Sequence, residues 1–292
     1  MSKIIGLNNI GNTCFFNSVL QLLYQCTILN KLLLSNKFDG EIVPMYTDFV
    51  CKYNSSSTSF SPTNIIHLIS SKLNRSSNSQ EDAEQYLNFL IDNITDELVI
   101  FLKKNNYDNI CITKNITTKR LIFNLFTLNI IKTIQCPNCN FTSSSNDNIN
   151  KLYLSITKNN ISLQELIHNY LYDQLDNDNQ WKCDKCKKSV NAIINKKIVS
   201  MPKYLIIVIK RYNNNNQKNN IPVNMPIALS INNLHYCLRG IILHSGSTNG
   251  GHYTYYGNNN NVWMLYNDSS VNICADIDNI KNNGYIYLYV NK

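Results

Sequence analysis

The first hundred residues carry apolar side chains at helical spacing. Apolar residues recur every three or four positions after Cys14, which predicts a helix that begins there and is capped by Thr13 or Asn12. The same period over about residues 80–98 predicts a second, longer helix. A Ser/Thr-rich loop over residues 54–64 separates the two. This part of the chain is therefore expected to be mainly helical.

The later part of the chain changes to strand patterns. Ser162 and Glu165 form a capping box, which predicts one further short helix. Runs rich in β-branched and aromatic residues then predominate, separated by Asn, Gly and Pro. We expect strands over residues 121–133, 204–210, 238–244, 252–256 and 285–290. Helices followed by strands indicate an α+β fold class.

Composition narrows the expected partners and compartment. Of 292 residues, 43% are hydrophobic, enough for a sizeable core, and 16% are charged. The net charge of +8 is spread thinly and no basic run exceeds a Lys-Lys pair, so no nucleic-acid partner is expected. No signal peptide is visible, and the apolar run over residues 204–209 is too short to span a membrane. We expect no membrane partner and a reducing compartment, the cytoplasm or nucleus, of a host cell if the chain is viral.

Two C-x-x-C pairs indicate a metal site. Cys136 and Cys139 form one pair, and Cys183 and Cys186 form the other. Together they offer the four sulfur ligands of a tetrahedral Zn2+ site without an open position, so the role predicted for zinc is structural. The long gap between the pairs puts them on separate strands of a finger-like insertion. The alternatives are pairs that no longer hold a metal, or redox pairs.

A candidate nucleophile lies near the N-terminus. Residues 6–13 form a loop with two glycines that leads into the helix beginning at Cys14. Free N–H groups and the macrodipole at a helix start stabilise a thiolate, and the same N–H groups can donate to an oxyanion. The side-chain amide of Asn9 is a further candidate donor. Without other catalytic residues nearby, however, a cysteine at this position is more often structural.

A histidine segment near the C-terminus offers a base for that nucleophile. His252 follows Gly250 and Gly251, which let a ligand backbone approach closely. A strand from His252 carries the imidazole into a cleft, and the next strand brings Asn267 or Asp268 to its far ring nitrogen. Such a residue fixes the tautomer of the base and orients it toward the thiol.

These segments resemble the signature boxes of the ubiquitin-specific proteases. The cysteine box of that family is similar to residues 6–21, GLNNIGNTCFFNSVLQ, and its histidine box is similar to residues 243–256 and 263–271. Between them, residues 80–87, QEDAEQYL, resemble the family's Q-x-D-A-x-E-F-L helix, and residues 201–212 resemble its P-x-x-L…K-R-F strand. The C-x-x-C pairs stand where the family has its zinc fingers. The resemblance covers nearly the whole chain in the right order.

The resemblance implies a fold and a reaction. The fold is papain-like, with thumb, fingers and palm, here about residues 1–115, 116–200 and 201–292 of a single catalytic domain. The reaction is that of a deubiquitinase, the thiol-dependent hydrolysis of the (iso)peptide bond after the C-terminal Gly-Gly of ubiquitin. Ubiquitin and ubiquitinated proteins are then the expected partners, and the enzyme is expected to be a monomer.

The resemblance also implies roles for single residues. Cys14 matches the nucleophile, His252 the base and Asn267 the third triad member. Asp268, the next residue, assists or substitutes for it, and Asn9 matches the oxyanion-hole residue. The channel for the ubiquitin tail is lined in the family at positions that correspond here to Gln80, Asp82 and His244.

One departure from the family bears on specificity. Gln85 stands where the family has Glu, and Tyr86 where it has Phe. Losing that carboxylate weakens binding of a tail whose arginines pair with acidic groups. This leaves open a protease for another ubiquitin-like modifier. An inactive ubiquitin-binding protein and a zinc-ribbon nucleic-acid binder are further alternatives, although the last leaves both boxes unexplained.

Overall fold

A helical region forms the N-terminal part of the chain. The computed structural model describes residues 3–75, 79–104, 111–113, 116–117, 124–175, 178–212, 217–247 and 250–292. Its first five helices are α1 (Cys14–Tyr24), α2 (Thr27–Leu34), α3 (Ile42–Ser55), α4 (Thr63–Lys72) and α5 (Ala83–Lys104). The mainly helical N-terminal part is confirmed, and α1 begins at Cys14 as predicted. The second predicted helix corresponds to α5, which starts and ends later than expected.

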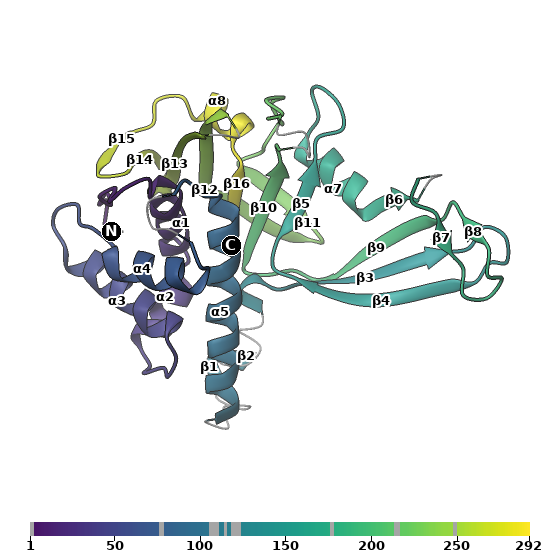
Figure 1. Ribbon diagram of the computed structural model, residues 1–292, viewed down its shortest axis with the longest axis horizontal. Helices are drawn as coiled ribbons and strands as arrows, with labels where there is room; N and C mark the ends of the chain where they lie inside the picture. The colour runs from purple at the N-terminus through teal and green to yellow at the C-terminus, as the bar shows by residue number, and fades with distance from the viewer. Residues whose placement is uncertain are drawn as a thin grey trace.

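An eight-stranded sheet, the palm sheet, lies beside these helices (Figure 1). Its strand order is β15-β14-β13-β12-β16-β10-β5, with β11 paired to β12. The strands are β5 (Leu152–Ser155), β10 (Tyr204–Lys210), β11 (Ala228–Ile231), β12 (Leu234–Ser247), β13 (Gly250–Asn259), β14 (Val262–Asn267), β15 (Ser270–Ile273) and β16 (Ile286–Asn291). Helix α8 (Ile277–Asn283) precedes β16. The four strands predicted after residue 200 are confirmed within this sheet.

A long four-stranded sheet extends away from the palm, toward the right of Figure 1, and forms the fingers. Its order is β4-β3-β9-β6, and a small hairpin of β7 and β8 lies at its tip. The strands are β3 (Leu128–Gln135), β4 (Thr142–Ile149), β6 (Tyr172–Gln174), β7 (Trp181–Lys182), β8 (Ser189–Val190) and β9 (Ile193–Ser200). Helix α7 (Leu163–Leu171) has the predicted capping box. A separate pair joins β1 (Cys111–Thr113) and β2 (Ile116–Thr117).

One predicted strand is wrong in its first half. Residues 121–123 lie outside the described part, residues 124–126 form a helical turn, and β3 begins only at Leu128. Leu125 and Phe126 are both buried against the helical region, and neighbouring strand residues cannot both face one side. In addition, β5 lies within the range predicted for the fingers but pairs with β10 of the palm sheet.

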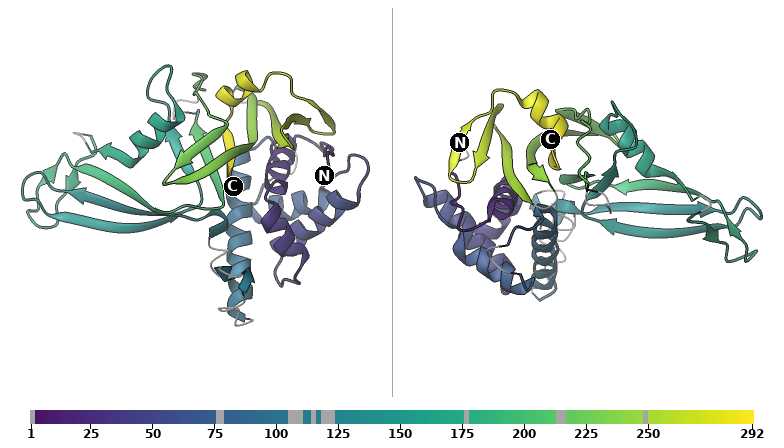
Figure 2. Two further views of the ribbon diagram at one scale, coloured as in Figure 1. Left: turned by 180° about the vertical axis from the view of Figure 1, so that it is seen from behind. Right: turned by 45° about the horizontal axis from the view of Figure 1, so that its top comes forward.

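The palm sheet separates two apolar cores. In β16, Ile286 and Leu288 join the core on the side of the helical region, whereas Tyr287 and Tyr289 join the core on the other side. This alternation is the two-residue period of a strand buried on both faces. Tyr253 and Tyr255 of β13 face the helical core. As a result α1 packs against β13, as both views in Figure 2 show.

Candidate active site

The loop before α1 presents Cys14 at the start of that helix. Thr13 occupies the N-cap position, but its hydroxyl accepts no helix N–H, so the side-chain cap predicted for Thr13 is wrong. The hydroxyl instead accepts from the N–H of Ile10 at 3.1 Å and donates to the side-chain oxygen of Asn9 at 3.2 Å. The N–H groups of Phe15 and of Cys14 itself therefore remain available, and both face the Cys14 thiol.

Opposing effects act on the Cys14 thiol. Burial raises its pKa, because a thiolate loses solvation when only 3% of the residue is exposed. The N–H of Tyr253 lowers the pKa, the negative charge of Asp268 raises it, and the N–H groups at the start of α1 lower it further. The net direction is upward. The helix start by itself therefore does not keep this sulfur ionised, and the thiol needs a base to take its proton.

His252 and Asn267 meet on neighbouring strands. The Nε2 atom of His252 lies 2.6 Å from the Oδ1 atom of Asn267. An amide oxygen only accepts, so this contact assigns the proton to Nε2 and leaves Nδ1 as the basic nitrogen. His252 precedes Tyr253, whose N–H faces the Cys14 sulfur. The strand β13 thus brings the histidine next to the cysteine, across 238 residues of sequence (252 − 14).

Asp268 faces the N-terminal loop instead of the imidazole. It has a left-handed backbone, with φ +49, which turns its carboxylate away from the direction of Asn267. The carboxylate accepts from the side-chain amides of Asn17 at 2.8 Å and Asn9 at 2.9 Å. Sequence reasoning assigned no role to Asn17. The available signal was its spacing, since a residue three positions after Cys14 shares its face of α1.

A cleft of about 350 Å³ lies between the helical region and the β12–β13 hairpin. It is lined by Cys14, Phe15, Gln80, Glu81, Asp82, Gln85, Tyr212, His244, Ser247, Gly250, Gly251 and Tyr253. The cleft therefore brings together the predicted nucleophile and all the residues predicted to bind the tail. Asn9 and Asp268 pair with each other outside this lining. His252 lies between two lining residues, Gly251 and Tyr253, and pairs with Asn267.

Two titratable side chains of the cleft are held by tyrosines. His244 is 8% exposed and its Nδ1 pairs with the hydroxyl of Tyr212. Burial, followed by the nearby charge of Lys218, lowers the pKa of His244 to about 4, so this imidazole is neutral at pH 7. The Asp82 carboxylate accepts from the Tyr285 hydroxyl at 3.0 and 3.1 Å. Burial raises the pKa of Asp82.

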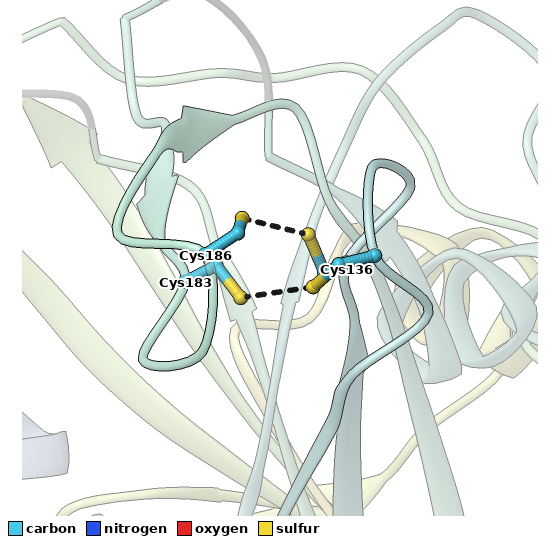
Figure 3. Close-up of side chains that lie close together, drawn as sticks. Cys136, Cys183 and Cys186 are labelled. Carbon is cyan, nitrogen blue, oxygen red and sulfur yellow. Dashed lines mark hydrogen bonds between the residues drawn. The ribbon is translucent and has the colours of Figure 1, made fainter.

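A second constellation lies at the fingertip. Cys136 and Cys139 follow β3, and Cys183 and Cys186 lie between β7 and β8, so the two pairs sit on separate strands as predicted. Their sulfur atoms all lie within 4.8 Å of one another (Figure 3). The Cys136–Cys186 distance is 3.8 Å and the Cys139–Cys183 distance is 3.7 Å. A tetrahedron with Zn–S bonds of about 2.3 Å has edges of about 3.8 Å, so the cluster fits this ion.

Comparison with known proteins identifies the family. A family model described as ubiquitin carboxyl-terminal hydrolase matches residues 5–289. The chain belongs to the ubiquitin carboxyl-terminal hydrolase family. It is 27% identical to ubiquitin carboxyl-terminal hydrolase Usp2 of Drosophila melanogaster, over 98% of this chain and 34% of that protein. It is 26% identical to ubiquitin carboxyl-terminal hydrolase 2 of Bos taurus, over 98% of this chain and 55% of that protein. The chain therefore spans only part of these relatives.

Solved structures of members of this family share the fold. The chain matches the SAGA Ubp8/Sgf11/Sus1/Sgf73 DUB module bound to ubiquitin aldehyde, with a TM-score of 0.78 and 23% identity. The match covers 99% of this chain and 70% of that one. It confirms the predicted papain-like α+β fold with thumb, fingers and palm. Within the described residues, no helix is both long and apolar enough to cross a bilayer.

Proposed function

We propose that this chain is a deubiquitinase that hydrolyses the (iso)peptide bond after the C-terminal Gly-Gly of ubiquitin. One observation carries the proposal. The buried thiol of Cys14 opens into a cleft beside a histidine whose Nε2 is held by Asn267 at 2.6 Å. A cysteine, a base and a residue that orients the base are the parts that nucleophilic catalysis by a thiol requires.

The proposed mechanism gives each group one step. His252 takes the proton of Cys14 on Nδ1, and the resulting thiolate attacks the carbonyl carbon of the terminal glycine. The N–H groups of Cys14 and Phe15 and the amide of Asn9 stabilise the oxyanion, with Asp268 fixing the Asn9 amide. His252 then protonates the leaving lysine amine. Water hydrolyses the thioester and regenerates the thiol.

One wall of the cleft is built from glycine. Gly250 and Gly251 both line the cleft, and a Cβ atom added to Gly251 would lie 2.3 Å from Nε2 of His244, so only glycine fits at that position. A wall of glycine lets the backbone of a substrate approach closely, which supports an extended modifier tail as the substrate.

The fingertip cysteines support a structural Zn2+ site. Cys136, Cys139, Cys183 and Cys186 would hold the ion, which would cross-link the turn after β3 to the β7–β8 hairpin at the fingertip and supply no step of the reaction. We propose that the cross-linked fingers hold the globular body of ubiquitin. Four thiolates and a thiol nucleophile all require reduced sulfur, which supports a cytoplasmic or nuclear setting, in a host cell if the chain is viral. The predicted monomer remains part of this proposal.

Substitution of Cys14 tests the activity. We expect Cys14→Ala to abolish cleavage of a ubiquitin–fluorophore conjugate and adduct formation with an electrophilic ubiquitin probe. Cys51→Ala, at a free and exposed cysteine of α3, is the matched control and should retain both. Full cleavage by Cys14→Ala would refute the proposal. A wild-type chain that binds ubiquitin but forms no adduct would instead be a silent binding protein.

One observation favours a second candidate, a protease for another ubiquitin-like modifier. Gln85 lines the cleft where the family has a carboxylate. The neighbouring Glu84 does not replace it, because its carboxylate lies 3.5 Å from the ammonium of Lys151 and accepts from the Tyr153 hydroxyl. A panel of electrophilic modifier probes decides between the candidates. A faster Cys14 adduct with another modifier than with ubiquitin would favour the second.

A further inference from the structure

The strand segment that carries His252 has an open edge toward the cleft. In the described part of the chain, β14 pairs with β13 only from Tyr255 onward, whereas β12 pairs with β13 from Gly250. The outer backbone groups of residues 250–253 therefore have no strand partner on that side. Groups from the helical region face them instead. One is the Cys14 sulfur, which the N–H of Tyr253 faces.

Gln80 covers the same edge on the other side of His252. Its Oε1 accepts from the N–H of Gly251 at 3.2 Å, and its Nε2 donates to the carbonyl oxygen of Gly251 at 3.3 Å. A carboxamide has the donor and acceptor of one peptide unit, so Gln80 replaces a missing neighbouring strand at this residue. The contact is close, since a Cβ atom on Gly250 would lie 3.1 Å from Oε1 of Gln80.

The segment that carries Gln80 is tied to the palm. It lies three residues before α5, in a segment that Asp82 anchors. The Asp82 carboxylate accepts from the N–H of Glu84 at 2.7 Å and from the hydroxyl of Tyr285 in the palm. The start of α5 is thus bonded to the palm through Asp82, and Gln80 just before it bonds to the glycine-rich hairpin. Glycine loses the most conformational freedom on ordering, so this hairpin gains most from an external anchor.

We propose that Gln80 is a positioning residue, which holds Gly251 so that His252 meets Cys14. This role goes beyond contact with the substrate tail, and it rests on the proposed thiol hydrolysis. Asn267 fixes one end of the imidazole, while Gln80 fixes the backbone that carries it. Without the second anchor the imidazole drifts from the thiol, and displacements of about 1 Å at a reacting group cost up to about a hundredfold in rate.

The first experiment measures Cys14 ionisation without ubiquitin. Iodoacetamide alkylation of Cys14, followed by peptide mass spectrometry across pH, reports how readily His252 takes the thiol proton. We expect Gln80→Ala to slow alkylation at neutral pH about tenfold, and to lower kcat on a ubiquitin–fluorophore conjugate by a similar factor, because the anchor is lost. Gln164→Ala, at an exposed position of α7, is the control and should change neither.

Two outcomes separate positioning from tail contact. If Gln80→Ala raises KM but leaves kcat and the alkylation profile unchanged, Gln80 only binds the tail and the proposal is wrong. If wild-type Cys14 alkylates with a histidine-dependent profile but no ubiquitin conjugate is cleaved, the proposed function fails while the positioning role stands. Melting temperatures of both variants show whether a loss reflects unfolding.

Two further variants probe the contact by its chemistry. Gln80→Glu keeps the size and the acceptor for the Gly251 N–H but loses the donor, and its charge faces a carbonyl oxygen. We expect Gln80→Glu to slow alkylation of Cys14 at least as much as Gln80→Ala does. Alkylation at the wild-type rate would contradict an anchor made of two hydrogen bonds.

Gly250→Ala should slow alkylation of Cys14 in the wild-type background but add little to the effect of Gln80→Ala, because both substitutions disturb the same contact. Additive losses would contradict that coupling.

Discussion

The catalytic cleft and the fingertip are held together by different means. Around the cleft, side chains from distant parts of the sequence bond to one another beside one large core, as Asn17 does with Asp268 across 251 residues. At the fingertip, the buried members of the apolar cluster among the described residues are Cys136, Cys183, Val190 and Ala192. A core of that size buries little apolar surface, and the proposed Zn2+ site would add a cross-link there. The two regions thus differ in how far packing alone holds them: a large core lies behind the cleft, and a small one lies at the fingertip.

The largest expected effect is a loss of activity at the cleft without a loss of stability. His252→Ala removes the base while the core behind β13 is unchanged, so kcat on a ubiquitin–fluorophore conjugate should fall on the order of a thousandfold. The melting temperature should change little, because His252 is only partly buried. His67→Ala, on the exposed face of α4, is the matched control. A His252→Ala enzyme with wild-type kcat would contradict the assignment of the base.

The next effect concerns the oxyanion. Asn9→Ala removes one side-chain donor to the oxyanion, so kcat should fall on the order of a hundredfold. Alkylation of Cys14 by iodoacetamide should persist in this variant. Asp268→Asn keeps the shape but loses the charge that orients the Asn9 amide, so a smaller loss of kcat is expected. Asn272→Ala in β15 serves as the control. If Asn9→Ala retained the full activity of the wild-type chain, the backbone N–H groups alone would suffice to stabilise the oxyanion.

A smaller effect should arise at the fingertip. Removing metal with a chelator, or substituting Cys183→Ser, should lower kcat/KM on ubiquitin conjugates about tenfold through KM, because the fingers lose their cross-link. Iodoacetamide alkylation of Cys14 should be unchanged, since the cleft does not depend on the fingertip core. Zinc released by the wild-type chain, measured by atomic emission, gives the stoichiometry. Loss of Cys14 alkylation would refute the independence of the two regions.

The smallest effect is the pH dependence of stability from His244. Its pKa is lowered from 6.5 to about 4 in the folded chain. Above pH 6.5 the His244 imidazole is neutral in both the folded and the unfolded chain. As the pH falls from 6.5 toward 4, this imidazole takes up a proton only in the unfolded chain. This group therefore lowers the free energy of unfolding in that window. His244→Gln should lose stability less steeply between pH 7 and 5 in urea titrations than wild type does. Equal slopes of stability against pH for the two chains would contradict the lowered pKa of His244.

Much of the fold was accessible from local patterns. The period after Cys14 predicted the start of α1, and the capping box of Ser162 and Glu165 predicted α7 because both signals act over a few residues. The strand expected over residues 121–133 begins only at Leu128, because a helical turn buries Leu125 and Phe126 together. The cap at Thr13 failed because its hydroxyl is taken by the loop before it. In both cases tertiary contacts outweighed local preference.

The sequence by itself determined the residue types of the site and their order. Cysteine, histidine and the Asn267–Asp268 pair stand in the order of the family's two signature boxes. It could not decide which member of the pair meets the imidazole. The left-handed backbone of Asp268 turns its carboxylate to Asn9 and Asn17, which leaves Asn267 for His252. Likewise, only the tertiary structure revealed the hold of Gln80, in the segment before α5, on Gly251, because that contact joins residues 171 positions apart. Long-range contacts of this kind follow from how the cores close, which no local pattern encodes.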